Sequence, residues 1–72
     1  MKIVYHVFNN DKYLLGSIVI EQSYVPSIDD IVYITEGKED IPDYSKCKVN
    51  YRDFTISNDG NSHASVDLIL TD

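Results

Sequence analysis

Apolar and polar residues alternate with a period of two along most of this chain, which is the pattern of strands that bury one face. In the first stretch, for example, Ile3, Tyr5 and Val7 share one face. No stretch repeats apolar residues at the spacing of a long amphipathic helix. The strands that this alternation predicts are residues 2–8, 13–21, 31–35, 47–57 and 64–71.

Turn-forming residues separate these stretches. Residues 9–12 favour a tight turn, because Asn and Asp tolerate left-handed backbone, so we expect the first two strands to form a hairpin. Residues 58–61 (Asn-Asp-Gly-Asn) are the strongest turn signal in the chain. The polar segment 36–46 contains Pro42 and is interpreted as a loop with no regular element. Gly16, inside the second stretch, indicates a bend or a bulge.

The fourth stretch, 47–57, changes parity partway along. Val49 and Tyr51 are expected to share one face, whereas Phe54 and Ile56 need the other parity to stay buried. One extra residue near positions 52–53, a β-bulge, would reconcile the two halves. The other apolar positions expected on the inner face are Leu14, Ile18 and Ile20 in the second stretch and Val66, Leu68 and Leu70 in the last.

These elements predict one domain, residues 1–72, built as an all-β, strongly bent, five-stranded sheet that curls into a small barrel. The sheet is expected to be mostly antiparallel and to lack a long helix. Closure of a barrel removes the exposed edges that an open sheet would carry. The sequence leaves open whether this barrel closes.

The segment Val-Pro-Ser-Ile-Asp-Asp-Ile-Val-Tyr-Ile, residues 25–34, resembles the P-x-hydrophobic-G-D-x-V-x-hydrophobic phrase of small SH3-like barrels. Asp29 stands where that phrase usually has glycine. The resemblance implies an SH3-like fold of the kind found in short orphan proteins of bacteria, phages and mobile elements. It implies no activity, because such barrels share none. The strands that follow the expected order are 18–20, 48–51 and 66–70.

The composition and charge of the chain exclude some classes of function. The 72 residues are 43% hydrophobic and 25% charged, as in ordinary globular domains, and the formal net charge is −6. An acidic chain is a poor binder of phosphate backbones. The single cysteine allows no internal disulfide, and no apolar run approaches the ~20 residues that span a bilayer. We therefore expect a cytoplasmic protein without membrane contact, and self-association to support a small core.

Candidate metal ligands and nucleophiles are few. His6, Cys47 and His63 lack the close pairs typical of zinc sites, so we expect no metal. Cys47 would need a nearby histidine to act as a nucleophile, and its neighbours Lys46 and Lys48 are expected on the other face of the strand. The chain contains no phosphate-binding glycine motif. The sequence thus predicts no catalytic residues, no cofactor and no enzyme.

Acidic residues gather in loops. The pairs 29–30 and 39–40, with Asp43 and Asp59, are interpreted as solvated side chains. One carboxylate of the pair 29–30 is expected to cap the main chain before the third strand.

Tyrosine is the more informative residue, since six tyrosines occur here and binding surfaces concentrate this side chain. Tyr24 and Tyr44 fall in the two longest connections, and Tyr33 is expected to face outward. These three are the predicted partner-binding residues. Aliphatic and aromatic side chains at positions where the alternation calls for polar ones predict self-association, and they are Ile31, Ile69, Val4 and Phe8.

Our first functional hypothesis is a non-enzymatic, oligomeric interaction module that binds a protein partner or a small ligand. The resemblance implies a phage or mobile-element protein that inhibits a host defence system. One alternative is a nucleotide- or oligonucleotide-binding barrel with anion contacts at Lys46, Lys48 and Arg52, although a long nucleic acid is not expected. The other alternative is an acidic nucleic-acid mimic, but the acids scatter along the chain.

Overall fold

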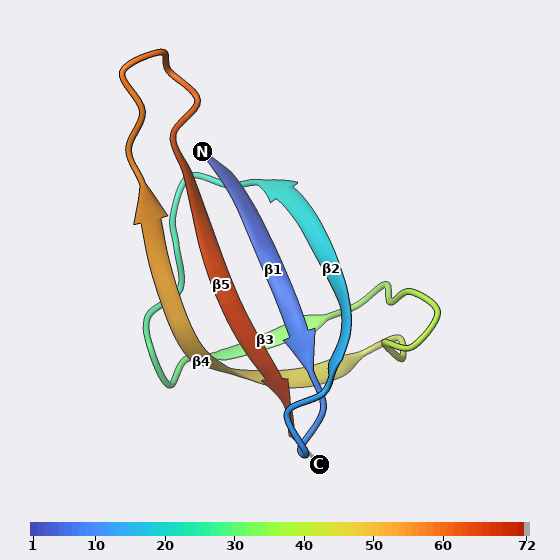
Figure 1. Cartoon of the computed structure of the whole chain (residues 1–72). Helices are drawn as coiled ribbons and strands as arrows, with labels where there is room; N and C mark the ends of the chain where they lie inside the picture. The colour runs from blue at the N-terminus through green and yellow to red at the C-terminus, as the bar shows by residue number, and fades with distance from the viewer. Residues whose placement is uncertain (72) are drawn as a thin grey trace.

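The structure is a computed structural model, and it describes residues 1–71. It confirms an all-β chain of five strands in this part of the sequence (Figure 1). The strands are β1 (Lys2–Phe8), β2 (Leu14–Glu21), β3 (Ile31–Ile34), β4 (Ser45–Thr55) and β5 (His63–Leu70).

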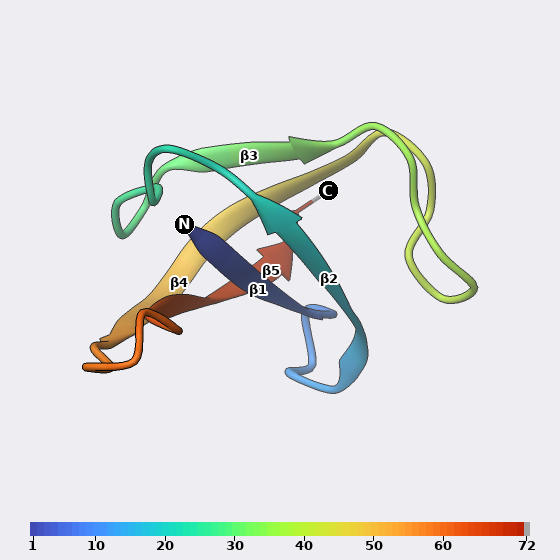
Figure 2. The ribbon, with the colours of Figure 1, turned by 90° about the horizontal axis from the view of Figure 1, so that it is seen from above.

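The five strands form one sheet in the order β2-β1-β5-β4-β3. β1 and β5 pair in parallel at its centre, and the remaining pairs are antiparallel, so the sheet is mostly antiparallel as predicted. β4 bends, because residues 45–48 pair with β3 while residues 47–55 pair with β5. The sheet therefore curls into a half-barrel that brings β3 over the strands at its other end (Figure 2). β2 and β3 are its two edges.

The core lies on the concave face of this curled sheet. Alternate residues of β1, β4 and β5 point inward and are buried, which confirms the predicted parity of the first strand and of most of the last. Leu15, Ile18, Val25, Val32, Ile34 and Leu70 pack against this centre and are partly buried. The buried hydrophobic residues are Ile3, Tyr5, Val7, Ile41, Cys47, Val49, Ala64, Val66 and Leu68.

The bulge of β4 lies at Asn50, two positions before the expected place. Val49 pairs with Leu68 and Tyr51 pairs with Asp67, so Asn50 is the extra residue. Tyr51 therefore does not share the face of Val49, contrary to the expectation from the alternation, but turns outward and is exposed. After the bulge, the even-numbered residues of β4 are the ones that point inward. Phe54 accordingly lies opposite Ala64. The expected burial is nevertheless wrong at Phe54, which is 49% exposed, and at Ile56, which is 78% exposed because it follows the last residue of β4.

The bulge predicted in β2 is confirmed next to Gly16. Val7 pairs with Gly16 and Phe8 pairs with Leu14, which leaves Leu15 as the extra residue. Leu15 therefore packs on the core, whereas Leu14 turns outward and is exposed, opposite to expectation. The shift arises because the bulge reverses the parity of the residue before it.

The β3–β4 connection contains more structure than the predicted loop. Lys38 and Ile41 exchange two main-chain hydrogen bonds, of 3.0 and 3.2 Å, and form a tight turn. This turn inserts Ile41 into the core, where it is 1% exposed. Gly37 is required beside it, because a Cβ atom there would lie 1.9 Å from the carbonyl oxygen of Ile41.

The segment before β3 is held by the capping carboxylate that the sequence predicts. Asp30 accepts a 2.8 Å hydrogen bond from the N–H of Ser27. Asp29, at the position where the SH3-like phrase has glycine, adopts a left-handed backbone with φ of 73°. Asp tolerates this conformation better than most residues.

Candidate binding groove

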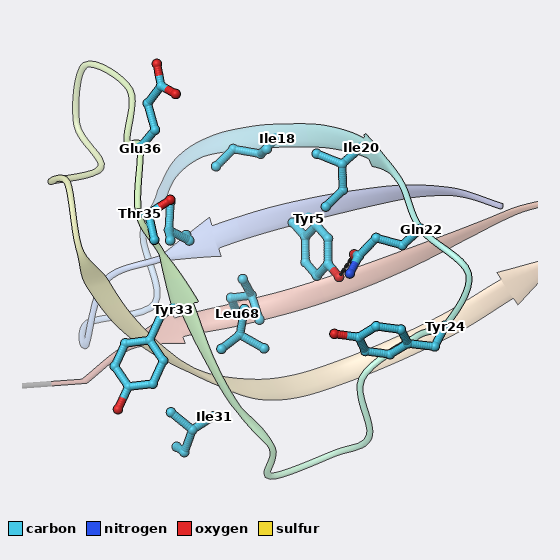
Figure 3. A pocket seen from close by; sticks show the side chains of 12 residues that line it. Tyr5, Ile18, Ile20, Gln22, Tyr24, Ile31, Tyr33, Thr35, Glu36 and Leu68 are labelled. Atoms are coloured by element: carbon cyan, nitrogen blue, oxygen red, sulfur yellow. Dashed lines mark hydrogen bonds between the residues drawn. The ribbon is translucent and has the colours of Figure 1, made fainter.

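A cavity of about 420 Å³ opens on the concave side of the half-barrel, between the two edge strands. We call it the groove (Figure 3). No residue of β4 lines it, so it lies on the side of β3 that faces away from β4. Its lining residues are Tyr5, Ile18, Ile20, Gln22, Tyr24, Ile31, Val32, Tyr33, Ile34, Thr35, Glu36 and Leu68.

The floor of the groove is apolar and its rim is polar. Ile18, Ile20 and Leu68 face it from the sheet, and Tyr5 points into it from β1 (Figure 3). The Tyr5 hydroxyl donates a hydrogen bond to Oε1 of Gln22. Burial, with a smaller effect of nearby Tyr24, raises the pKa of Tyr5, so the phenol stays protonated at neutral pH. An apolar floor with a few placed polar groups is typical of ligand sites.

The charge of the groove is negative. Among the lining residues that lie within 1–71, Glu36 is the one charged side chain, and lysine, arginine and histidine are absent. In residues 1–71, neither Glu36 nor the acids at the tip of the following turn, Glu39 and Asp40, form an ion pair. The groove therefore favours neutral or cationic ligands over phosphates.

The main chain of β3 is open on the groove side. A 2.9 Å hydrogen bond from the N–H of Val49 to the carbonyl of Asp30 identifies these two residues as a hydrogen-bonded pair of the β3–β4 ladder. Because hydrogen-bonded pairs alternate in an antiparallel ladder, Val32 and Ile34 bond to β4. The N–H and C=O groups of Ile31 and Tyr33 then point away from β4.

The edge of β2 is partly covered. By the same alternation, Ser17 and Val19 present their main-chain groups to the free edge, since Ile18 and Ile20 pair with β1. The Nζ atom of Lys38 donates a 2.9 Å hydrogen bond to the carbonyl of Ser17. A lysine at an edge opposes pairing with further strands.

The structure brings two of the three predicted partner-binding residues to the groove. Tyr24 and Tyr33 line it, although the ring of Tyr33 projects outward from β3, on the same side as Ile31 (Figure 3). Tyr44 lies in the β3–β4 connection, 80% exposed, and does not line the groove. The sequence analysis missed Tyr5 as a lining residue, because its place in the alternation marks it as core.

Three of the four predicted self-association residues, Phe8, Ile69 and Ile31, share one row on the outward side of the sheet. Ile31, at the edge of the sheet, also borders the groove. Val4 lies apart from this row, beside Val19. Phe8, Val4 and Ile69 are half-buried, and Ile31 is 46% exposed. Successive cross-strand partners form the row, which consists of Leu14, Phe8, Ile69, Lys48 and Ile31.

The predicted anion contacts lie outside the groove and do not converge. Lys46 and Lys48 are exposed on β4, and Lys48 forms a 3.3 Å ion pair with Asp29. The Arg52 guanidinium donates hydrogen bonds to the carbonyls of Val25 and Pro26, at 3.3 and 3.1 Å. It also lies 5.6 Å from the centre of the Phe54 ring. Arg52 thus anchors the β2–β3 connection.

The candidate metal ligands and the thiol are separated. Cys47 is fully buried, and this burial raises its pKa. His6 is half-buried on β1 and shares a 2.9 Å hydrogen bond with Oγ of Ser17. His63 begins β5, and residues 1–71 contain no group of three side chains that could hold a metal ion.

The curled sheet and its open groove define the class of this protein as a small all-β half-barrel. Comparison of the chain with protein-family models, curated proteins and solved structures finds no match. Over the part of the chain that the structure describes, no helix is long and apolar enough to cross a membrane.

Proposed function

We propose that this chain is a non-enzymatic interaction module whose groove binds an apolar side chain of a protein partner. The supporting observation is the open apolar floor between β2 and β3, where Ile20 remains 40% exposed. Full burial of the partner's aliphatic side chain in this groove contributes about 1.5–3 kcal/mol, against which the entropic cost of association counts.

A protein partner fits this groove better than a nucleotide does. Within the described part of the chain, the lining offers no cation for a phosphate, and its one charge is the carboxylate of Glu36. Tyr24 at the rim adds a large amphipathic surface that is 66% exposed. Inhibition of a host defence system, a cytoplasmic location and an oligomeric state remain predictions of the sequence.

The test is selection from a random peptide-display library, followed by binding to a matched pair of variants. Ile20→Arg fills the groove, whereas Val19→Arg places the same charge on the adjacent residue, which faces the other side of β2. Peptides selected by the wild type should bind Ile20→Arg about 10-fold or more weakly. They should bind Val19→Arg almost unchanged.

Circular dichroism of both variants is the control for folding. Failure to select any peptide, or equal binding by the two folded variants, contradicts a groove-binding module.

A further inference from the structure

We propose that the occupant of the groove is an extended segment of a partner protein that adds as a strand to the free edge of β3. Its centre alternates apolar residues, and both of its ends carry Lys or Arg. This inference rests on the proposed function and specifies how the groove is filled. Strand addition of this kind combines main-chain hydrogen bonds with pockets for alternate side chains.

The free edge of β3 supplies the hydrogen bonds. Ile31 and Tyr33 direct their N–H and C=O groups away from β4, and in residues 1–71 no other group bonds to them from that side. A strand added there can pair with both residues. β2 is the less suitable edge, because Lys38 already occupies the carbonyl of Ser17.

The groove supplies the side-chain pocket. Val32 and Ile34 face the concave side of β3, and the floor formed by Ile18 and Leu68 lies on that same side. Because successive side chains of a strand alternate between faces, every second side chain of the added strand enters the groove. Apolar residues at these positions match the apolar floor.

Charge determines the ends of the segment. Asp29 and Asp30 precede β3, and Glu36 follows it closely. Lys48 is the cation paired with Asp29, whereas Glu36 forms no ion pair in the described chain. Among residues 1–71, Asp30 at one end and Glu36 at the other form no ion pair, so each end keeps a negative charge that basic residues of an added strand complement.

The same charges disfavour a second copy of this chain. Antiparallel pairing of two β3 strands would bring the Asp29–Asp30 end of each copy to the Glu36 end of the other. Parallel pairing would bring the two Asp29–Asp30 ends together. Both arrangements place like charges opposite each other, which is destabilising. A basic partner segment avoids this repulsion.

The probe is the synthetic peptide Lys-Lys-Val-Thr-Ile-Thr-Val-Lys-Lys, labelled for fluorescence anisotropy. Two matched peptides accompany it: one with glutamates in place of the lysines, and one N-methylated at the amides that face β3. N-methylation removes main-chain donors but keeps every charge. We expect the basic peptide to bind, and each matched peptide to bind at least about 10-fold more weakly.

A variant pair tests the protein side. Tyr33→Pro removes the N–H that faces the free edge, which an edge strand tolerates, whereas Tyr33→Ala removes the side chain and keeps the N–H. Tyr33→Pro should weaken binding by at least about 10-fold more than Tyr33→Ala. The two peptides that differ only by N-methylation give the same information if Tyr33→Pro does not fold.

The outcomes separate the two proposals. If display-selected peptides bind in the groove but tolerate N-methylation, strand addition is wrong and the proposed function stands. Equal binding of the basic and the acidic peptide would contradict the proposal that the partner segment carries basic residues at its ends. If no peptide of any sequence binds, both proposals fail.

Discussion

Lys38 and Ser17 are joined across the open side of the half-barrel by a 2.9 Å hydrogen bond from the lysine Nζ atom to the serine carbonyl oxygen. The bond connects the β3–β4 connection to the edge strand β2. Ile41, in the same turn as Lys38, approaches β2 as well, since a Cβ atom on Gly16 would lie 3.4 Å from its Cδ1 atom. The connection therefore closes one end of the half-barrel and leaves the groove open beside it.

Removal of the Lys38 ammonium should expose the β2 edge to further pairing. For Lys38→Met we expect a decrease of about 0.5–1.5 kcal/mol in the free energy of unfolding, because one hydrogen bond is lost. Self-association should increase, as measured by sedimentation velocity. Lys46→Met is the control, because Lys46 is exposed and its ammonium forms no ion pair within residues 1–71. Equal association of the two variants would refute edge protection by Lys38.

Ile41 should contribute to the core as strongly as a strand residue does. Ile41→Ala is expected to lower the free energy of unfolding by about 2–5 kcal/mol, because it leaves a cavity under the turn. Ile56→Ala removes the same atoms at a position that is 78% exposed, and its effect should stay within about 0.5 kcal/mol. Urea denaturation measures both. Similar values for the two variants would show that the turn does not pack on the core.

Substitution by alanine should destabilise the fold at both Gly37 and Gly60, but for different reasons. At Gly37 the new Cβ atom would lie 1.9 Å from the Ile41 carbonyl oxygen, so the turn must move and Ile41 must leave its site. At Gly60 the surroundings are open and only the left-handed backbone, with φ of 85°, opposes alanine, at a cost of about 1–2 kcal/mol. Gly37→Ala should be the more destabilising of the two in thermal denaturation. The opposite order would contradict the close approach of Gly37 to Ile41.

Cys47 should be protected from thiol reagents while the chain is folded. Its side chain is buried, and burial raises its pKa, so the thiolate is scarce at pH 8. Labelling by iodoacetamide should therefore require unfolding, and it should accelerate in urea. Rapid labelling of the folded protein would contradict this burial.

The raised pKa of Cys47 should make the folded chain less stable at alkaline pH. The folded-state pKa of Cys47 lies above the unfolded value, so its contribution is fully present below about pH 8.5 and is lost as the pH rises further. Tyr5 adds a similar loss near and above about pH 10. Cys47→Ala should remove the first part of this alkaline decline in the free energy of unfolding.

Local alternation predicted the strands because side-chain parity is a property of neighbouring residues. The exact position of a bulge does not follow from this local pattern, because Asn50 is one of several polar residues near the parity change that could have been the extra one. Ile41 stands alone among polar residues, so no period marks it as core. Only the Lys38–Ile41 turn shows that it is buried.

The groove was predictable only in part. The tyrosine content pointed to Tyr24 and Tyr33, which line it. Alternation identified Ile18 and Ile20 as inner positions, but it could not show that they line an open groove. That exposure arises because β2 is an edge strand, and strand order depends on long-range pairing.

The central parallel ladder also determines when the sheet can form during translation. Lys2 of β1 pairs with His63 of β5, so this ladder can form only after β5 has left the ribosome. Until then the edge of β1 that pairs with β5 in the folded sheet has no partner. The central ladder therefore stays unformed until β5 has emerged, and the apolar residues and unpaired strand edges exposed in that interval favour aggregation.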